Sequence, residues 1–142
     1  MEHEGKILEF SLYGGNFDKA GEASSKIKRL LQQIGIRADI IRRIAICAYE
    51  AEMNVIIHAQ RGLLKATIFP DHTELRILDE GPGIPSIDLA MKEGFSTAPD
   101  HIREMGFGAG MGLPNIKRCA DEFAITSEVG EGTDLIVRIN HN

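Results

Sequence analysis

The sequence predicts an α+β fold, a two-layer α/β sandwich in which a mixed, mostly antiparallel sheet carries its helices on one face. Hydrophobic periodicity changes along the chain in the order strand, helix, helix, strand, strand, loop, helix, strand, strand. This order is not the alternating strand–helix series that builds a parallel sheet. The chain has 142 residues, 43% of them hydrophobic, with no internal repeat or linker, so residues 1–142 are expected to form a single domain around one core.

The first half of the chain predicts one strand followed by two helices. Residues 5 to 13 alternate apolar and polar side chains, as a half-buried strand does. Apolar residues then recur at helical spacing over residues 18 to 34, and Gly35 follows as a stop signal. Asp39 is suited to cap the N-terminus of a second helix, over residues 39 to 58.

The second half predicts two hairpins separated by a long loop and a third helix. The expected strands are residues 62–69, 73–78, 123–128 and 134–140, and the expected helix is residues 111–122. The first hairpin turns at Pro70-Asp71-His72 and the second at Val129-Gly130-Glu131-Gly132. After Leu78 come roughly 30 residues rich in Gly and Pro, and a loop of this length in a compact domain is usually functional.

Composition argues against several classes of protein. The net charge of −5 disfavours nucleic acid as a partner, because phosphates require a basic surface. No apolar run approaches the ~20 residues that span a bilayer, and the charged N-terminus lacks a signal-peptide core. Cys47 and Cys119 lie in predicted helices without metal-ligand spacing. These features predict a cytoplasmic protein without a membrane partner.

Polar residues interrupt the apolar second helix in the stretch ICAYEAEMNVIIHA, residues 46 to 59. On a helix Glu50 and Asn54 lie about 40° apart, whereas Glu52 faces about 200° away from Glu50. A solvated or salt-bridged Glu50 is the simpler interpretation, because burying an unpaired carboxylate is costly. The other interpretation is a site, in which an amide oxygen binds Mg²⁺ and the carboxylate acts as a general base.

Glycines define a second candidate site region immediately before the third helix. They occupy every other position of GFGAGMGL, at Gly106, Gly108, Gly110 and Gly112. A backbone without side chains can approach phosphates closely, and a helix N-terminus offers free N–H groups. A flexible loop is the alternative, since the spacing fits neither common nucleotide-binding template.

Two further motifs lie at strand ends. In LDEGPGI, residues 78 to 84, Asp79 either ends a strand in a simple turn or accepts a hydrogen bond from a purine amino group, with Gly81 and Gly83 making room for the ring. In EVGEGTDLIV, residues 128 to 137, the glycines either form an ordinary hairpin turn or place the Thr133 hydroxyl beside an adenine.

Taken in order, these four motifs resemble the boxes of the GHKL (Bergerat-fold) ATPases. The matching stretches are EAEMN at 50–54, DEGPGI at 79–84, GFGAGMGL at 106–113 and GEGT at 130–133. The resemblance implies a Bergerat fold with an ATP lid, bound ATP and Mg²⁺, Asn54 as the Mg²⁺ ligand and Asp79 as the adenine reader. It also implies nucleotide-binding roles for Gly81, Gly83, Ile84, Gly106, Gly108, Gly110, Met111, Gly112, Leu113 and Thr133.

A narrower resemblance is to the small anti-sigma-factor-type serine/threonine kinases, especially the switch kinases of the stressosome. It rests on the compact size, on VIIHA at 55–59 and on the run EGFSTAPDHIREMGFGAGMGLPNIKRCADEFAITSEVGEGT. It implies that Glu50 activates a Ser or Thr hydroxyl on a STAS-domain antagonist protein, and that the kinase also binds and activates a PP2C-type phosphatase. Arg103 is a candidate for contacting phosphate, and His58 is either a packing or a catalytic residue.

Other functions stay open at this stage. A nucleotide-gated anti-sigma or phosphatase regulator without transfer activity would carry the same boxes. The ATP-binding half of a histidine kinase would need a helical hairpin bearing its phosphoacceptor histidine, and water-directed ATP hydrolysis is typical of larger machines. The sequence leaves a homodimer open.

Overall fold

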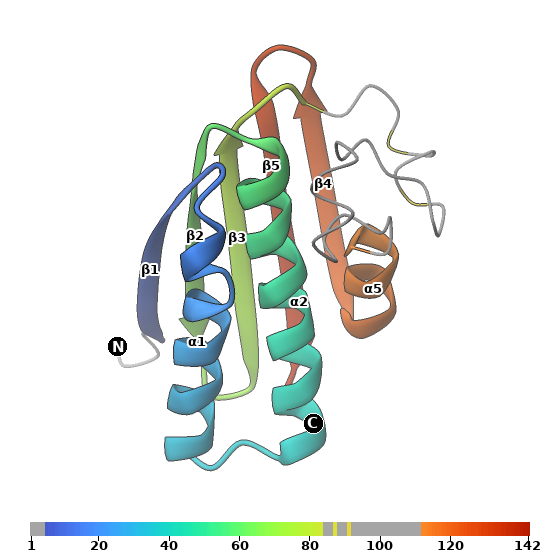
Figure 1. The fold of residues 1–142 in the computed structure, drawn as a ribbon. Coiled ribbons are helices and arrows are strands. Elements are labelled where there is room, and N and C mark those ends of the chain that lie inside the picture. The colour runs from blue at the N-terminus through green and yellow to red at the C-terminus, as the bar shows by residue number, and fades with distance from the viewer. Residues whose placement is uncertain (1–4, 84–86, 88–90, 92–111) are drawn as a thin grey trace.

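The computed structural model describes residues 5–83, 87, 91 and 112–142, and these build a five-stranded sheet in the order β1-β2-β3-β5-β4 (Figure 1). Every pairing is antiparallel, so this part of the sheet is more regular than the mixed sheet expected. The strands are β1 Lys6–Tyr13, β2 Arg61–Ile68, β3 His72–Glu80, β4 Glu122–Glu128 and β5 Gly132–Asn140.

The helices form a second layer on one face of the sheet, as the sequence predicts (Figure 1). They are α1 Glu22–Gln33, α2 Ala38–His58 and α5 Gly112–Cys119. Helix α2 lies between the other two and contacts both. Within the described ranges, no helix combines the length and apolar character needed to cross a membrane.

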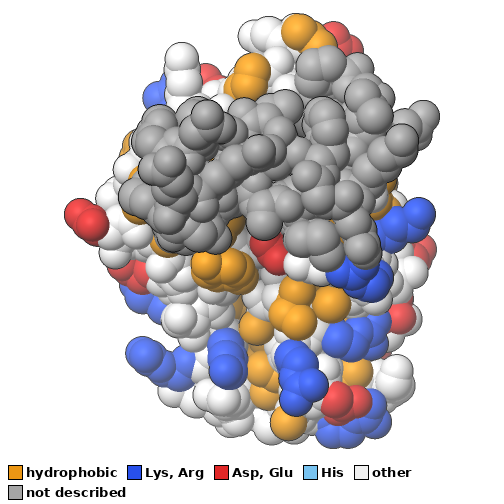
Figure 2. All heavy atoms as spheres, turned by 45° about the vertical axis from the view of Figure 1, so that its right-hand side comes forward, with side chains coloured by type: hydrophobic (Ala, Val, Ile, Leu, Met, Phe, Trp, Pro, Cys, Tyr) orange, Lys and Arg blue, Asp and Glu red, His pale blue; other side chains and the backbone are white. Residues whose placement is uncertain are grey.

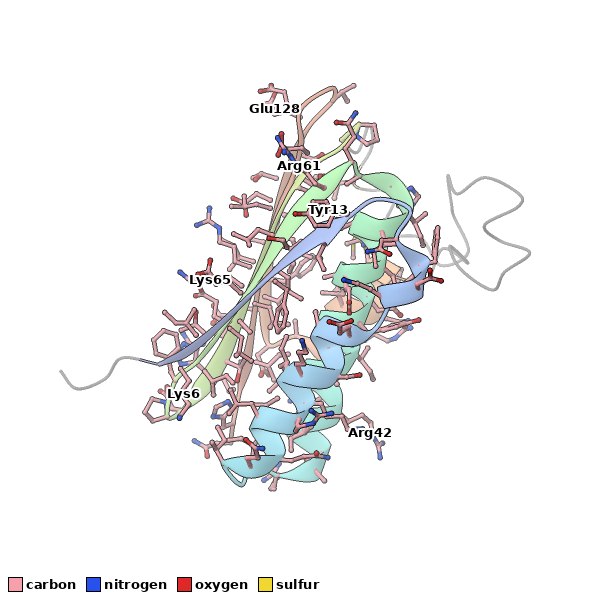
Figure 3. All side chains as sticks on the ribbon, turned by 60° about the vertical axis from the view of Figure 1, so that its left-hand side comes forward. Lys6, Tyr13, Arg42, Arg61, Lys65 and Glu128 are labelled. Atoms are coloured by element: carbon pink, nitrogen blue, oxygen red, sulfur yellow. The ribbon has the colours of Figure 1, made fainter. Side chains whose placement is uncertain are left out.

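Strand alternation places the apolar side chains between the two layers. In β5, for example, Leu135, Val137 and Ile139 are buried while the residues between them are not. The same alternation in β1 buries Leu12 and leaves Tyr13 exposed on the outer face of the sheet (Figure 3). The face expected to be apolar is therefore the face that packs against the helices.

The first helix differs from the prediction for residues 18–34. Phe17–Lys19 forms a separate 3-10 turn, and α1 begins only at Glu22. The break lies at Gly21, whose φ of 90° is a left-handed conformation that glycine adopts without strain. Gly21 has no side chain that could cap α1, so the first backbone amides of this helix need an acceptor from another part of the protein.

Two other helix ends were also predicted wrongly. Helix α2 begins at Ala38, and Asp39 lies in its first turn with its carboxylate bound by the Arg37 guanidinium at 2.8 Å instead of capping the helix. Helix α5 ends at Cys119 rather than near residue 122, because the next residues join the sheet. The amide of Asp121 donates to the carbonyl of Arg138 at 2.9 Å.

Candidate functional site

The described motifs converge where the second half of α2, the end of β3 and the start of α5 meet. A Cβ atom placed on Gly81 would lie 3.0 Å from the Cα of Ala59, at the end of α2. A Cβ on Gly112 would lie 3.3 Å from Oδ1 of Asn54. The glycine positions thus allow β3 and α5 to approach α2 closely, and three of the four sequence motifs become neighbours.

Asp79 lies at the end of β3, opposite Thr133 of β5. Its Oδ1 accepts the backbone N–H of Thr133 at 3.1 Å. Burial raises the pKa of Asp79 above its ordinary value, and the Thr133 N–H partly opposes this shift. Among the described residues Oδ2 has no hydrogen-bond partner, so this oxygen can accept a hydrogen bond from a ligand amino group.

The hairpin between β4 and β5 is packed against this carboxylate. Gly132 has a φ of 141°, and a Cβ there would lie 2.0 Å from the Asp79 carbonyl oxygen. Gly83 has a φ of 77°, and its Cβ would lie 2.3 Å from the carbonyl oxygen of Glu128. The amide of Gly130 also donates to the carbonyl of Pro82 at 2.9 Å. The first and last glycine motifs therefore interlock, and a side chain at either glycine would separate them.

The Thr133 hydroxyl faces Ser127 of β4, with the two oxygens 3.0 Å apart. Ser127 also donates its hydroxyl to the carbonyl of Gly132 at 3.1 Å. When Ser127 uses its proton in this way, Thr133 must be the donor between the two hydroxyls. The lone pairs of the Thr133 oxygen then remain available to a ligand donor.

Glu50 is half-buried on the side of α2 that faces α5. Its Oε2 accepts the side-chain N–H of Asn115 at 2.6 Å. Arg118 in turn donates to Oδ1 of Asn115, so a chain of three polar groups fixes the carboxylate. The sequence analysis missed Asn115, which lies 65 residues from Glu50 and belongs to none of the motifs.

Asn54 lies one helical turn beyond Glu50 and is also half-buried. Its carboxamide makes no hydrogen bond to any residue in the described ranges. The oxygen lies beside the first residue of α5, at a helix start whose first N–H groups have no acceptor within the helix itself. An amide oxygen beside a helix N-terminus, a position that favours anions, fits a Mg²⁺ ion that carries phosphate and water as its other ligands.

Glu52 is the one fully buried carboxylate of α2 among the described residues, with 1% of its surface exposed. Its two oxygens accept the backbone N–H groups of Ala23 at 3.2 Å and Ser24 at 3.3 Å. These are two of the amides that α1 leaves free after Gly21, so Glu52 caps α1 from a neighbouring helix. The sequence correctly separates Glu52 from Glu50 but gives it no role.

The other candidate residues divide into two groups. Leu113 is buried in the core, and His58 is half-buried, which lowers the pKa of its imidazole. For the Cys47 thiol, which is an acid and not a base, burial and the nearby Cys119 raise the pKa to about 12. Six predicted residues lie outside the described ranges: Ile84, Arg103, Gly106, Gly108, Gly110 and Met111.

Comparison with known proteins identifies the class of fold. Residues 16–139 match the family described as "Histidine kinase-like ATPase domain". The chain is 33% identical over 112 residues to the serine/threonine-protein kinase RsbT of Bacillus subtilis, covering 76% of this chain and 78% of that protein. It is 30% identical over 138 residues to the anti-sigma F factor of Priestia megaterium, covering 92% and 88% of the two chains. The anti-sigma F factor of Clostridium beijerinckii is 29% identical over 122 residues, with 82% of each chain covered.

The match to the family extends over all the described helices and strands except β1, which precedes it, and the last residue of β5. The sheet, its one-sided helical layer and the convergence of the motifs agree with this match. The chain therefore belongs to the histidine kinase-like (GHKL) ATPase domain family.

Proposed function

We propose that this protein is an ATP-dependent serine/threonine protein kinase of the partner-switching type. The observation that carries the proposal is the pair formed on α2 by Glu50, which Asn115 holds in place, and Asn54, whose amide has no hydrogen bond to any described residue. A carboxylate and a metal-ligating amide one turn apart are the groups that phosphoryl transfer to a hydroxyl needs. One of the matched relatives is named a serine/threonine-protein kinase.

The nucleotide would lie across the end of the sheet. Asp79 would accept the adenine amino group through Oδ2, and Thr133 would offer its hydroxyl oxygen beside the ring. Asn54 would hold Mg²⁺, which supplies charge neutralisation to the phosphates when bound. The N–H groups at the start of α5 would face the same phosphates.

Glu50 would accept the proton of the acceptor hydroxyl during transfer. A general base must be held in one orientation and must be unprotonated at the working pH. The Asn115 donor meets the first requirement, because it binds Oε2, while Oε1 has no partner among the described residues and can face the incoming hydroxyl. The half-buried position also limits competing hydration of the carboxylate.

We propose that the acceptor is a Ser or Thr of a STAS-domain antagonist protein, and that a PP2C-type phosphatase is a second partner. These partners follow from the likeness to small anti-sigma-factor-type kinases. The alternative is a nucleotide-gated binding module, and the relatives named anti-sigma F factor favour it as the second candidate.

The deciding experiment offers γ-labelled ATP and Mg²⁺ together with purified STAS-domain proteins from the source genome. The wild-type chain should label one of them. Glu50→Gln should reduce transfer by about 100-fold or more, because it removes the base, while ATP binding stays intact. The matched control Glu9→Gln, on the exposed face of β1, should behave as wild type.

Two results would redirect the proposal. Normal transfer by the Glu50→Gln variant would show that another group takes the proton. ATP binding without label transfer to any STAS-domain protein would favour the binding module.

A further inference from the structure

A groove runs along the surface between α1 and α2 and ends at Glu50. Its volume is about 730 Å³. From Ala38 to Glu50 helix α2 rises by about 18 Å, so the groove has the length of five or six extended residues or about three turns of helix. It therefore has the dimensions of a peptide segment rather than of a small metabolite.

The lining of the groove is apolar along its middle and basic at its sides. Ile36, Ile41 and Ile46 contribute apolar surface, and each is buried or half-buried. Lys28 of α1 and Arg42 of α2 contribute the cations, and both are exposed. Figure 3 shows Arg42 projecting outward from the helical layer. Figure 2 shows hydrophobic side chains in the middle of the face that carries α2, with Lys and Arg side chains around them.

Neither of these two groove cations is neutralised by an ion pair within the described part of the chain, whereas several cations on or next to the same helices are. Lys26 pairs with Glu22, Arg37 with Asp39, and Arg43 with Asp121. Lys28 and Arg42 have no ion pair with any residue in the described ranges, although the whole chain carries a net charge of −5. Unpaired cations on an otherwise acidic protein indicate an anionic partner.

From these features we infer that the groove is the docking site for the segment of the acceptor protein that flanks its phosphorylated hydroxyl. The segment combines apolar side chains, which cover the isoleucines, with acidic side chains, which pair with Lys28 and Arg42. Its position along the groove presents the adjacent hydroxyl to Glu50. The inference rests on the proposed kinase function and adds to it the chemistry by which the acceptor is selected.

A nucleic acid fits this groove less well. Nucleic acids are held mainly by rows of cations along their phosphates, whereas the floor of this groove is aliphatic. An apolar floor with a basic rim is instead typical of grooves that bind amphipathic peptide segments.

The test reverses the two charges in the doubly substituted variant Lys28→Glu/Arg42→Glu. Its matched control is Arg29→Glu/Lys65→Glu, which changes the net charge equally but alters an α1 residue outside the groove and a β2 residue of the sheet. Two readings are taken for each STAS-domain protein of the source genome. One is the KM and kcat of phosphoryl transfer, and the other is direct binding to the ADP-loaded chain by calorimetry.

The groove variant should raise the KM for the acceptor about tenfold or more with kcat at saturation and ATP affinity unchanged, because two ion pairs become repulsive. The wild-type KM should rise with added salt, and that of the groove variant should not. The control variant should match wild type.

Failure of the docking groove and failure of the kinase function would give different combinations of acceptor binding, phosphoryl transfer and KM. Normal transfer with a KM that the groove variant does not change would overturn the docking groove and leave the kinase function standing. Binding that the groove variant abolishes, without transfer by the wild type, would support the groove and refute the kinase. Absence of STAS binding by the wild type would overturn both.

Discussion

Replacing Glu52 tests how α1 is held to α2. Glu52→Leu keeps a similar volume but leaves the amides of Ala23 and Ser24 without their acceptor inside the protein. Each unsatisfied buried N–H costs about 1–3 kcal/mol, and removal of the buried carboxylate charge offsets part of that sum. The expected loss in the free energy of unfolding is therefore about 3 kcal/mol. Glu52→Gln keeps one acceptor oxygen and should lose about 1–2 kcal/mol.

The assay is urea unfolding at pH 7 followed by far-UV circular dichroism, with amide hydrogen exchange at positions 23 and 24. Both amides should exchange faster in the leucine variant, because α1 frays from its first turn. The control is Glu22→Gln, since the Glu22 side chain belongs to the same turn but is 52% exposed and, among the described residues, pairs only with Lys26. That variant should lie within about 0.5 kcal/mol of wild type. A leucine variant as stable as this control would refute the capping role of Glu52.

Three further outcomes are expected. Because burial raises the pKa of Asp79, the cost of its charge is absent at low pH and appears as pH rises through that pKa. The Asp79→Asn variant should be at least as stable as wild type at pH 7 without ligand, yet should lose the thermal shift that ATP and Mg²⁺ produce. Asn115→Leu removes the donor to Glu50 and should lower kcat about tenfold without weakening ATP binding, as stopped-flow and titration would show; an unchanged kcat would contradict the orienting role. Burial lowers the pKa of His58, so the unfolded chain binds its proton first as pH falls. Stability should therefore decline below about pH 6.5, and His58→Gln should flatten this decline in urea titrations at pH 7 and 5.5.

The sequence alone predicted the sheet and the order of the elements. Strand alternation and helical periodicity report burial directly, which is why the apolar face of each strand was found correctly. Helix ends were less predictable, because they depend on competing partners. Asp39 has a capping side chain, but the Arg37 guanidinium binds it. Residue 121 continues a helical pattern, but pairing with Arg138 places it beside the sheet.

The candidate site was predictable only where a motif marks it. Asp79 and Thr133 come together through the register of β3 and β5, which the two flanking glycine motifs signal in the sequence. Asn115 and the capping role of Glu52 carry no such signal. Both depend on which helices lie beside α2, and a helical wheel gives the direction of a side chain without naming its neighbour.

Within about 6 Å along its axis, helix α2 presents three polar groups to its two neighbouring helices, two of them to α5 and one to α1. Glu50 contacts α5 through Asn115, Glu52 contacts the start of α1, and Asn54 faces Gly112. Substitutions in this stretch are therefore expected to be epistatic, because a shift of α2 caused by one variant displaces the other two groups. The change in activity or stability measured for a single substitution would then include effects of the displaced neighbouring groups. Double-mutant cycles across positions 50, 52 and 54 are the appropriate measure of what each group does alone.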